Sequence, residues 1–372
     1  MTARFERPAN VVVKVGSSSL RDGDGHLDPV QVRRLATQVA GLHATGMRVV
    51  VVTSGAVAAG MGRLGLDARP TDTPTLQAAA AAGQGALVHA YQQVLDEHGV
   101  VGAQLLLSQD DFVVRRRYLN ARTSLQRLLE LGAVPIINEN DAVATDELTY
   151  GDNDHLAALV ASMLGAELLV MLSDVEGLLD RPPSEVGATL VRTVEDPGTV
   201  DLARVGGVGS AVGSGGMRTK LGAAQVATRS GMHVVIADAR RPDVLADVVG
   251  GGDVGTWFVA RTGRLEARRL WIAFALRVRG RLHVDAGAAR ALTGGAASLL
   301  GVGVTAVDGT FSAGDAVEVA GPDGHVVARG LVAYDADDVR RLIGLASDVA
   351  VERLGAGFGR EVVHRDDLVV LD

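Results

Sequence analysis

The sequence has no cysteine and few aromatic residues. Among its 372 residues, Phe, Trp and Tyr together make up 3%. A chain without cysteine forms neither a disulfide bond nor a thiolate metal site. Since aromatic residues are scarce, Val, Leu and Ala have to fill the core, and the hydrophobic share of 47% is enough for a sizeable one.

A long apolar run and an excess of positive charge are also missing. No uninterrupted apolar stretch approaches the ~18–20 residues of a membrane span. Residues 1–10 carry charge without the apolar segment of a signal peptide. The formal net charge of −8 at pH 7 argues against nucleic-acid binding through bulk charge, although a local basic patch is not excluded. We therefore expect a soluble cytoplasmic protein.

Up to about residue 260, short apolar runs alternate with longer segments of helical periodicity. The predicted strands are residues 10–16, 47–56, 100–108, 133–141, 166–174 and 232–238. The predicted helices are residues 29–46, 75–98, 117–132 and 215–231. Strands separated by helices predict a mostly parallel sheet with helices on both faces, which is a three-layer α/β fold.

The pattern changes after about residue 265. Short alternating strands follow, separated by the turns "VDGT" and "GPDG". They predict a second, small, β-rich and barrel-like domain. We expect the boundary near the arginine-rich segment 261–271.

Polar residues gather where the predicted strands end, which is where ligands bind in an open parallel sheet. The first strand carries Lys14 followed by Gly16, and the second ends at Ser54. A lysine in a buried strand is costly unless it is paired, and small residues before a helix leave backbone N–H groups for an anion. We interpret Lys14 as a cation aimed at phosphate, with an edge lysine and simple capping by Ser54 as the structural alternatives.

The fourth and fifth strands end in further polar groups. Residues 137–142, "INENDA", carry more polar side chains than a turn requires, so we expect substrate contacts, with a carboxylate available to an ammonium group. Ser173 and Asp174 end the fifth strand, where they could meet a nucleotide or form an ordinary turn.

Two helix starts add to this chemistry. Residues 152–154 are Asp, Asn and Asp before an apolar helical run, and one capping side chain is all that a helix start accepts. The glycine loop 213–220, "GSGGMRTK", brings Lys220 to the first turns of another helix, an arrangement that can cradle phosphate without the Walker spacing. Two lysines, anion-binding turns and carboxylates are what phosphoryl transfer needs.

Five motifs, taken in their order along the chain, resemble those of the glutamate 5-kinase family of the amino acid kinase superfamily. They are "VVVKVGSSSL", "VVVVTSGAVAAG", "VPIINENDAVA", "YGDNDHLAALVA" and "GSGGMRTKLGAA". The later segments "HVDAGAARAL" and "VHRDDLV" resemble a PUA domain. The resemblance implies an amino acid kinase domain at residues 8–262, a linker at 263–276 and a PUA domain at 277–364.

The resemblance also implies an activity. The enzyme would transfer the γ-phosphoryl group of ATP to the side-chain carboxylate of L-glutamate, the first step of proline biosynthesis. Mg²⁺ would be held mainly by the ATP phosphates and water, with no direct protein ligand expected. Proline would act as feedback inhibitor, the chain would form a homo-oligomer, and the labile γ-glutamyl phosphate would be handed to γ-glutamyl phosphate reductase.

Carried over residue by residue, the resemblance assigns roles. Lys14 and Lys220 would stabilise the transferring phosphoryl group, and Asp154 would hold both lysines in position. The expected glutamate-binding residues are Ser54, Asp141, Asn153, Asn138 and Asp152. The expected ATP-binding residues are Lys14, Ser173, Asp174, Ser214, Gly215, Gly216, Met217, Arg218, Thr219 and Lys220.

One segment departs from the family pattern. The family often continues the fifth strand with "TDxxGLYTxDPR", whereas this chain has "SDVEGLLDRPPS" at residues 173–184. Leu179 stands where the pattern has Tyr, and the Asp-Pro-Arg order is lost. The contacts to the nucleotide base are therefore not predicted, while the phosphate site is unaffected.

Two alternatives compete with this interpretation. A kinase of the same fold for N-acetylglutamate, aspartate, carbamate or UMP is disfavoured by "INENDAVA" together with "GDND" and by the second domain. An RNA-binding protein is the other, because PUA domains often contact RNA and arginines cluster near the boundary. They are Arg261, Arg264, Arg268, Arg269, Arg277, Arg279 and Arg281. We interpret this stretch as a solvated linker face, which disfavours RNA binding by the PUA domain without excluding it beside a kinase activity.

Overall fold

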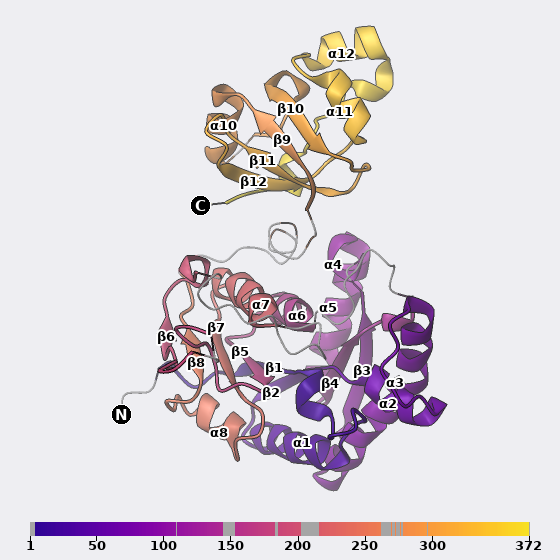
Figure 1. The fold of residues 1–372 in the computed structure, drawn as a ribbon, viewed down its shortest axis with the longest axis vertical. Helices are drawn as coiled ribbons and strands as arrows, with labels where there is room; N and C mark the ends of the chain where they lie inside the picture. Colours follow the sequence, from indigo (N-terminus) through magenta and orange to yellow (C-terminus); the bar gives the residue numbers. More distant parts are fainter. Residues whose placement is uncertain are drawn as a thin grey trace. The chain divides into compact units, whose positions relative to one another are not determined.

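The computed structural model describes residues 4–108, 110–143, 153–182, 185–201, 216–261, 269, 272, 276, 278–295 and 297–371. The chain divides into two compact units, Met1–Ala267 and Arg268–Asp372, both drawn in Figure 1. Most of the predicted linker, 263–276, lies outside the described residues, so the limits expected for the two domains stay predictions.

The first unit is built on one eight-stranded sheet. Its strands are β1 (Asn10–Val15), β2 (Arg48–Thr53), β3 (Gly102–Leu107), β4 (Val134–Glu139), β5 (Leu168–Ser173), β6 (Thr193–Val194), β7 (His233–Asp238) and β8 (Thr256–Phe258). They are ordered β3-β4-β2-β1-β5-β7-β8-β6. All neighbouring pairs are parallel except β7 with β8. The mostly parallel sheet predicted from the sequence is therefore confirmed.

Helices cover both faces of this sheet. They are α1 (Pro29–Ala44), α2 (Ala56–Leu64), α3 (Thr73–Glu97), α4 (Asp110–Val113), α5 (Arg115–Glu130), α6 (Asn153–Leu164), α7 (Met217–Arg229) and α8 (Val244–Val249). Figure 1 shows α1 and α8 on one face and α6 and α7 on the other. The three-layer arrangement expected from the alternating pattern is thus confirmed.

The first strand shows why these residues form a buried, two-faced layer. Val11, Val13 and Val15 belong to the core cluster that includes α1, α3 and α8. Since successive side chains of a strand point to opposite faces, Lys14 faces the other layer, where α6 and α7 begin. The strand that fills the core thereby also delivers one lysine to the opposite side.

Helices α2 and α3 cross with their backbones in contact. A Cβ added at Gly60 of α2 would stand 1.8 Å from the carbonyl oxygen of Ala79, and one at Gly83 of α3 would stand 1.9 Å from that of Ala56. Real Cβ atoms do not approach that closely, so only glycine fits either position. This contact fixes the direction in which the N-terminus of α2 points.

The second unit has a core and a sheet of its own. Its strands are β9 (Val278–Val284), β10 (Val304–Gly309), β11 (Ala316–Ala320), β12 (Val326–Leu331) and β13 (Leu368–Val370), and its helices are α10 (Ala286–Thr293), α11 (Ala336–Leu342) and α12 (Ser347–Leu354). The order is β10-β9-β11-β12-β13, with only β9 and β11 parallel. The expected β-rich second domain is confirmed.

Within the part of the chain that the structure describes, no helix combines the length and apolar character that crossing a membrane requires.

Candidate active site

Two buried lysines share one carboxylate at the centre of the first unit. Lys14 Nζ lies 2.5 Å from Asp154 Oδ1, and Lys220 Nζ lies 3.4 Å from Asp154 Oδ2. The relative exposure of the three residues is 4% for Lys14, 5% for Lys220 and 1% for Asp154. The sequence predicted that a lysine in the first strand needs a partner, and these distances identify that partner.

The fold brings these three groups together from distant parts of the chain. Lys14 comes from β1, Asp154 from the first turn of α6 and Lys220 from the first turn of α7. Thr219 adds a hydrogen bond from its Oγ1 to Asp154 Oδ2 at 2.7 Å. The N-terminal ends of two helices therefore meet beside β1, and each adds partial positive charge there.

The charges of this cluster shift one another's pKa. Burial alone would raise the pKa of Asp154, but Lys14 and Lys220 outweigh it and hold that pKa well below the usual range of a carboxyl group. Burial lowers the pKa of the Lys220 ammonium, with Asp154 opposing that shift and Lys14 adding to it. Asp154 therefore stays ionised at neutral pH, and two buried lysines that share this single carboxylate favour an anion beside them.

The first turn after β1 leaves room beside Lys14. A Cβ at Gly16 would stand 3.7 Å from Lys14 Nζ and 3.5 Å from the carbonyl oxygen of Leu172 on the next strand. The backbone at Gly16 is extended, so its conformation does not demand glycine. The absent side chain instead keeps the approach to the ammonium group open to a ligand.

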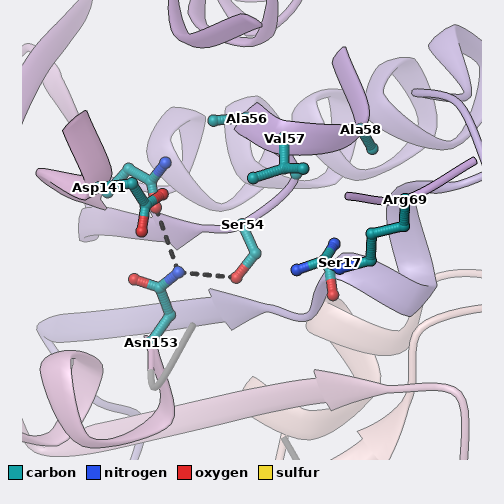
Figure 2. Close-up of a pocket in the computed structure, with 10 residues that line it drawn as sticks. Ser17, Ser54, Ala56, Val57, Ala58, Arg69, Asp141 and Asn153 are labelled. Atoms are coloured by element: carbon teal, nitrogen blue, oxygen red, sulfur yellow. Dashed lines mark hydrogen bonds between the residues drawn. The ribbon is translucent and has the colours of Figure 1, made fainter. Parts of the chain in front are cut away.

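A polar pocket lies next to this cluster (Figure 2). Ten residues line it: Ser17, Ser54, Gly55, Ala56, Val57, Ala58, Arg69, Asn138, Asp141 and Asn153. Four of the five predicted glutamate-binding residues are in this set, and the fifth, Asp152, lies outside the described residues. The structure thus brings together the ends of β1, β2 and β4 and the start of α6, as the strand-end argument expected.

A chain of side-chain amides connects the back of the pocket. Asn153 Nδ2 donates to Ser54 Oγ at 2.8 Å and to Asn138 Oδ1 at 3.1 Å, as Figure 2 shows. Asn138 Nδ2 in turn donates to Gln84 Oε1 on α3 at 2.8 Å. Asn153 is buried, yet its Oδ1 has no hydrogen-bond partner among the described residues. A buried acceptor left unpaired is costly, so a donor on a ligand would complete this network.

The front of the pocket is formed by the start of α2. Its N-cap, Gly55, has a left-handed backbone with φ 109° and offers no side chain to the first turn. The backbone N–H groups at the start of a helix have no partner within the helix, and the helix dipole makes that end partly positive. An anion is therefore favoured beside residues 56–58, which line the pocket.

Two charged side chains of opposite sign line the pocket as well. Burial raises the pKa of Asp141 to about 6, while the charge of Arg69 opposes the rise. Asp141 belongs to the short helix η2 (Asp141–Val143) after β4, whereas exposed Arg69 lies in the connection between α2 and α3. Figure 2 draws Arg69 and Asp141 among the side chains that line the pocket.

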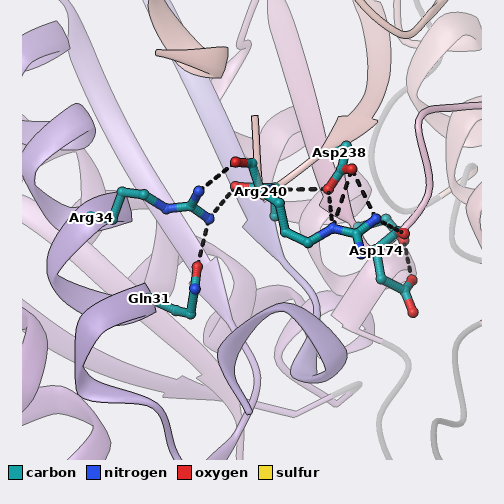
Figure 3. A network of polar contacts seen from close by, with 7 residues as sticks. Gln31, Arg34, Asp174, Asp238 and Arg240 are labelled. Carbon is teal, nitrogen blue, oxygen red and sulfur yellow. Dashed lines mark hydrogen bonds and ion pairs between the residues drawn. The ribbon is translucent and has the colours of Figure 1, made fainter. Parts of the chain in front are cut away.

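Beyond the ends of β5 and β7, a second polar network holds Asp174. Ser173 Oγ donates to Asp174 Oδ1 at 3.2 Å, and the charge of Asp174 is felt at Lys220. Arg240 donates from Nη2 to the carbonyl oxygen of Asp174 at 2.8 Å and to Asp238 Oδ2 at 2.9 Å, as drawn in Figure 3. Asp174, one of the predicted nucleotide residues, therefore lies close enough to the lysine cluster for its charge to act on Lys220.

The predicted phosphate loop is described in part. Gly216 is the N-cap of α7, and Met217, Arg218, Thr219 and Lys220 form its first turn. Ser214 and Gly215 lie outside the described residues. The described part places a helix N-terminus and a lysine together, and its role as a phosphate cradle stays a prediction.

Three residues at these sites escaped the sequence analysis: Arg69, Gln84 and Arg240. Arg69 lies in a connection without periodicity, and Gln84 lies inside a long helix that reads as ordinary surface and core. Arg240 follows β7 in "ADARRPD", at a strand end, so the strand-end argument could have found it.

Comparisons with known proteins bear on this site. The family described as "Amino acid kinase family" matches residues 10–238, and the PUA domain matches residues 280–352. Glutamate 5-kinase from Burkholderia multivorans (strain ATCC 17616 / 249) is 46% identical over 362 residues, which are 97% of this chain and 97% of that protein. Glutamate 5-kinase from Salinispora arenicola (strain CNS-205) is 46% identical over 372 residues, covering 100% of both chains. Among solved structures, UMP kinase from Bacillus anthracis aligns with 68% of this chain and 97% of its own, at 15% identity and a TM-score of 0.48.

Proposed function

Because the chain belongs to the glutamate 5-kinases of the amino acid kinase family and is therefore a kinase, we propose that it phosphorylates the γ-carboxylate of L-glutamate with ATP, as the first step of proline biosynthesis. The observation that carries the proposal is the buried cluster of Lys14, Asp154 and Lys220. Asn153, next to Asp154 in the chain, lines the polar pocket, and the charge of Asp174 acts on Lys220. A phosphoryl donor and acceptor could meet there.

The pocket supports an amino acid as acceptor. Asp141 and the unpaired Asn153 Oδ1 are acceptors for an ammonium group. Arg69 and the start of α2 offer positive charge to the carboxylates. An amino acid with a second carboxylate matches this mixture of groups better than an uncharged acceptor does.

The chemistry needs no proton transfer by the protein. The acceptor carboxylate is already ionised at neutral pH, so one of its oxygens attacks the γ-phosphorus of ATP while the bond from that phosphorus to the ADP oxygen breaks. Asp154, whose pKa is held far below neutral, cannot serve as a general base. Its role in the proposal is to position the two lysines.

Lys14 and Lys220 supply the electrostatic stabilisation. Negative charge spreads over the oxygens of the transferring phosphoryl group. Fixed cations in a site away from bulk water stabilise that charge more than they would in solvent. The glycine at residue 16 lets the group approach the ammonium of Lys14 without a side chain in the way.

We infer that Mg²⁺ reaches the site on the ATP phosphates. No group of three or more His, Asp or Glu side chains in the described residues could hold a metal ion, and Asp154 is already engaged by both lysines. With Asp154 paired to the lysines, the ligands proposed for the cation are mainly phosphate oxygens and water. Such an ion would neutralise charge between the β- and γ-phosphates.

Proline is proposed as the feedback inhibitor, acting at this pocket. It shares an α-carboxylate and an amino group with glutamate but has no side-chain carboxylate to phosphorylate. The groups that support binding of the amino acid end, Asp141, Asn153 and Arg69, would therefore accept proline as well. A homo-oligomer and transfer of the product to γ-glutamyl phosphate reductase are part of the same proposal, because both follow from the family alone.

The test is ATP turnover with Mg²⁺ and L-glutamate, with the acyl phosphate trapped by hydroxylamine, in the presence and absence of proline. Glutamate-dependent hydroxamate that proline suppresses is the expected result. Turnover on N-acetylglutamate, aspartate, carbamate or UMP instead of glutamate would overturn the proposal that glutamate is the substrate. Hydroxamate formation that proline leaves unchanged would overturn only the proposal of feedback inhibition.

A further inference from the structure

We propose that Arg240 is a positioning residue for ATP, acting through the backbone of Asp174. The inference rests on the proposed function, because it takes the ends of β5 and β7 as the nucleotide side of the site. The network in Figure 3 holds the start of the segment after β5. This is the segment in which the chain departs from the family pattern.

Arg240 joins two strand ends through one guanidinium group. It binds Asp238 at the end of β7 with three side-chain contacts, from Nε at 3.0 and 3.2 Å and from Nη2 at 2.9 Å. The same Nη2 reaches the carbonyl oxygen of Asp174 at 2.8 Å. A planar guanidinium held by a carboxylate has a fixed direction, so its remaining hydrogen bond fixes the carbonyl of Asp174.

The turn that carries Arg240 is itself tied down. Ala239 donates its backbone N–H to the carbonyl oxygen of Ser173 at 2.7 Å. Arg34 of α1 donates to the carbonyl oxygens of Ala239 and Arg240 at 2.5 and 2.6 Å, and Gln31 holds Arg34 at 2.6 Å. The turn that carries Arg240 is thus held by α1 and the end of β7, and the Arg240 side chain binds the backbone of the loop after β5.

Downstream, the segment after β5 has a second, separate anchor. Leu178 donates its backbone N–H to Thr256 Oγ1 at 2.8 Å, in the buried start of β8. Between Asp174 and Leu178 the described residues Val175 and Glu176 are exposed. Arg240 therefore holds the near end of this segment together with the Ala239–Ser173 backbone bond, where the nucleotide is expected, and Thr256 holds its far end.

Charge alone does not account for this arrangement. If Arg240 served only to attract ATP by its charge, the three contacts with the Asp238 carboxylate would work against that role, because Asp238 offsets the positive charge. The adjacent Arg241 shows the contrast: it pairs with Asp247 of α8 at 2.9 and 3.0 Å and does not reach Asp174 in the described contacts. Both arginine side chains are largely exposed, at 65% and 52%.

The experiment compares Arg240→Ala with Arg241→Ala, a neighbour that loses the same charge. Loss of one hydrogen bond of this kind should raise the KM for ATP about 3- to 10-fold in Arg240→Ala, with the KM for glutamate unchanged. Arg241→Ala should leave both constants near wild type. Equal KM values for ATP in the two variants would overturn the inference.

A second variant separates positioning from charge by the sign of its effect. Asp238→Asn removes a negative charge, so simple electrostatics predicts tighter ATP binding, whereas loss of the support for Arg240 predicts weaker binding. We expect a higher KM for ATP and a smaller rise in melting temperature on adding ATP. A lower KM would overturn the inference.

Two readouts distinguish a failure of the proposed function from a failure of the role proposed for Arg240. The ATP-induced rise in melting temperature reports nucleotide binding even without an acceptor. If wild type shows that rise but no glutamate-dependent turnover, the substrate proposal fails while the role of Arg240 is still decided by the variants. If wild type turns over glutamate and Arg240→Ala matches it in both readouts, only the role of Arg240 fails.

Discussion

Replacing Asp154 by Asn removes the charge that holds two buried lysines together. Asp154 lies 2.5 Å from Lys14 Nζ and 3.4 Å from Lys220 Nζ, at 1% exposure. Asn keeps the shape and can still accept a hydrogen bond from Thr219. The two ammonium groups then repel each other without a carboxylate between them, and the Lys220 pKa, already lowered by burial, falls further.

The substitution should lower both kcat and the free energy of unfolding. Loss of one preorganised electrostatic element costs about 10²–10³ in kcat. Removing one partner of a buried ion pair costs about 3–5 kcal/mol of unfolding free energy. The lower end applies here, since Lys220 can release its proton. For a unit of this size, about 3 kcal/mol corresponds to a melting temperature lower by about 6–12 °C, so the variant should still be folded at 25 °C.

The assay is hydroxamate formation at saturating ATP and glutamate, with thermal unfolding measured on the same samples. Asp247→Asn is the control, because its carboxylate is partly exposed and pairs with exposed Arg241 rather than with a buried lysine. A folded Asp154→Asn variant with a kcat within threefold of wild type would refute the reasoning. Its deficit should also shrink as pH is lowered, because Lys220 regains its proton.

Three further results are expected. With a pKa of about 6 for Asp141, kcat/KM for glutamate should fall about tenfold per pH unit below 6 as that carboxylate is protonated, and Asp141→Asn should flatten this limb while raising the glutamate KM. Gly60→Ala places a Cβ 1.8 Å from a backbone oxygen and should lower unfolding free energy by about 3 kcal/mol or more; Gly85→Ala, with nothing within 4 Å, should be stabilising by about 0.5–1 kcal/mol. Arg69→Ala should raise the glutamate KM about tenfold through a lost charge-assisted contact, whereas Arg63→Ala, outside the pocket-lining set, should not; equal KM values would contradict its role.

Much of the fold was predictable because its strands are local signals. Runs such as "NVVVKV" and "RVVVVT" are buried on both faces, so they read as strands wherever they occur. Physical reasoning also showed that Lys14 needs a partner. It could not identify Asp154 as that partner, since 139 intervening residues separate the two and only the folded sheet brings them together. The family motifs supplied that assignment, and the roles of the site residues stay predictions.

Helix α2 shows what local patterns could not predict. A turn leading into a helix was expected after the strand 47–56, but the extent of that helix was not predicted, and residues 56–64 form one that contains Gly60 and Gly62. Glycine weakens a helix in isolation, and here the close contact with α3 compensates for it. Arg69 escaped for a different reason: an exposed arginine in a connection has no signal of its own until the pocket around it is known.

The contact between α2 and α3 also determines how the pocket can move. Since backbone meets backbone at Gly60 and Gly83, no side chain lies at that point of contact whose rotamers could absorb a change in the angle between the helices. Helix α2 carries the amides at the front of the pocket, and α3 carries Gln84, which holds Asn138 at its back. We therefore expect the two walls to keep their relative orientation when a substrate binds.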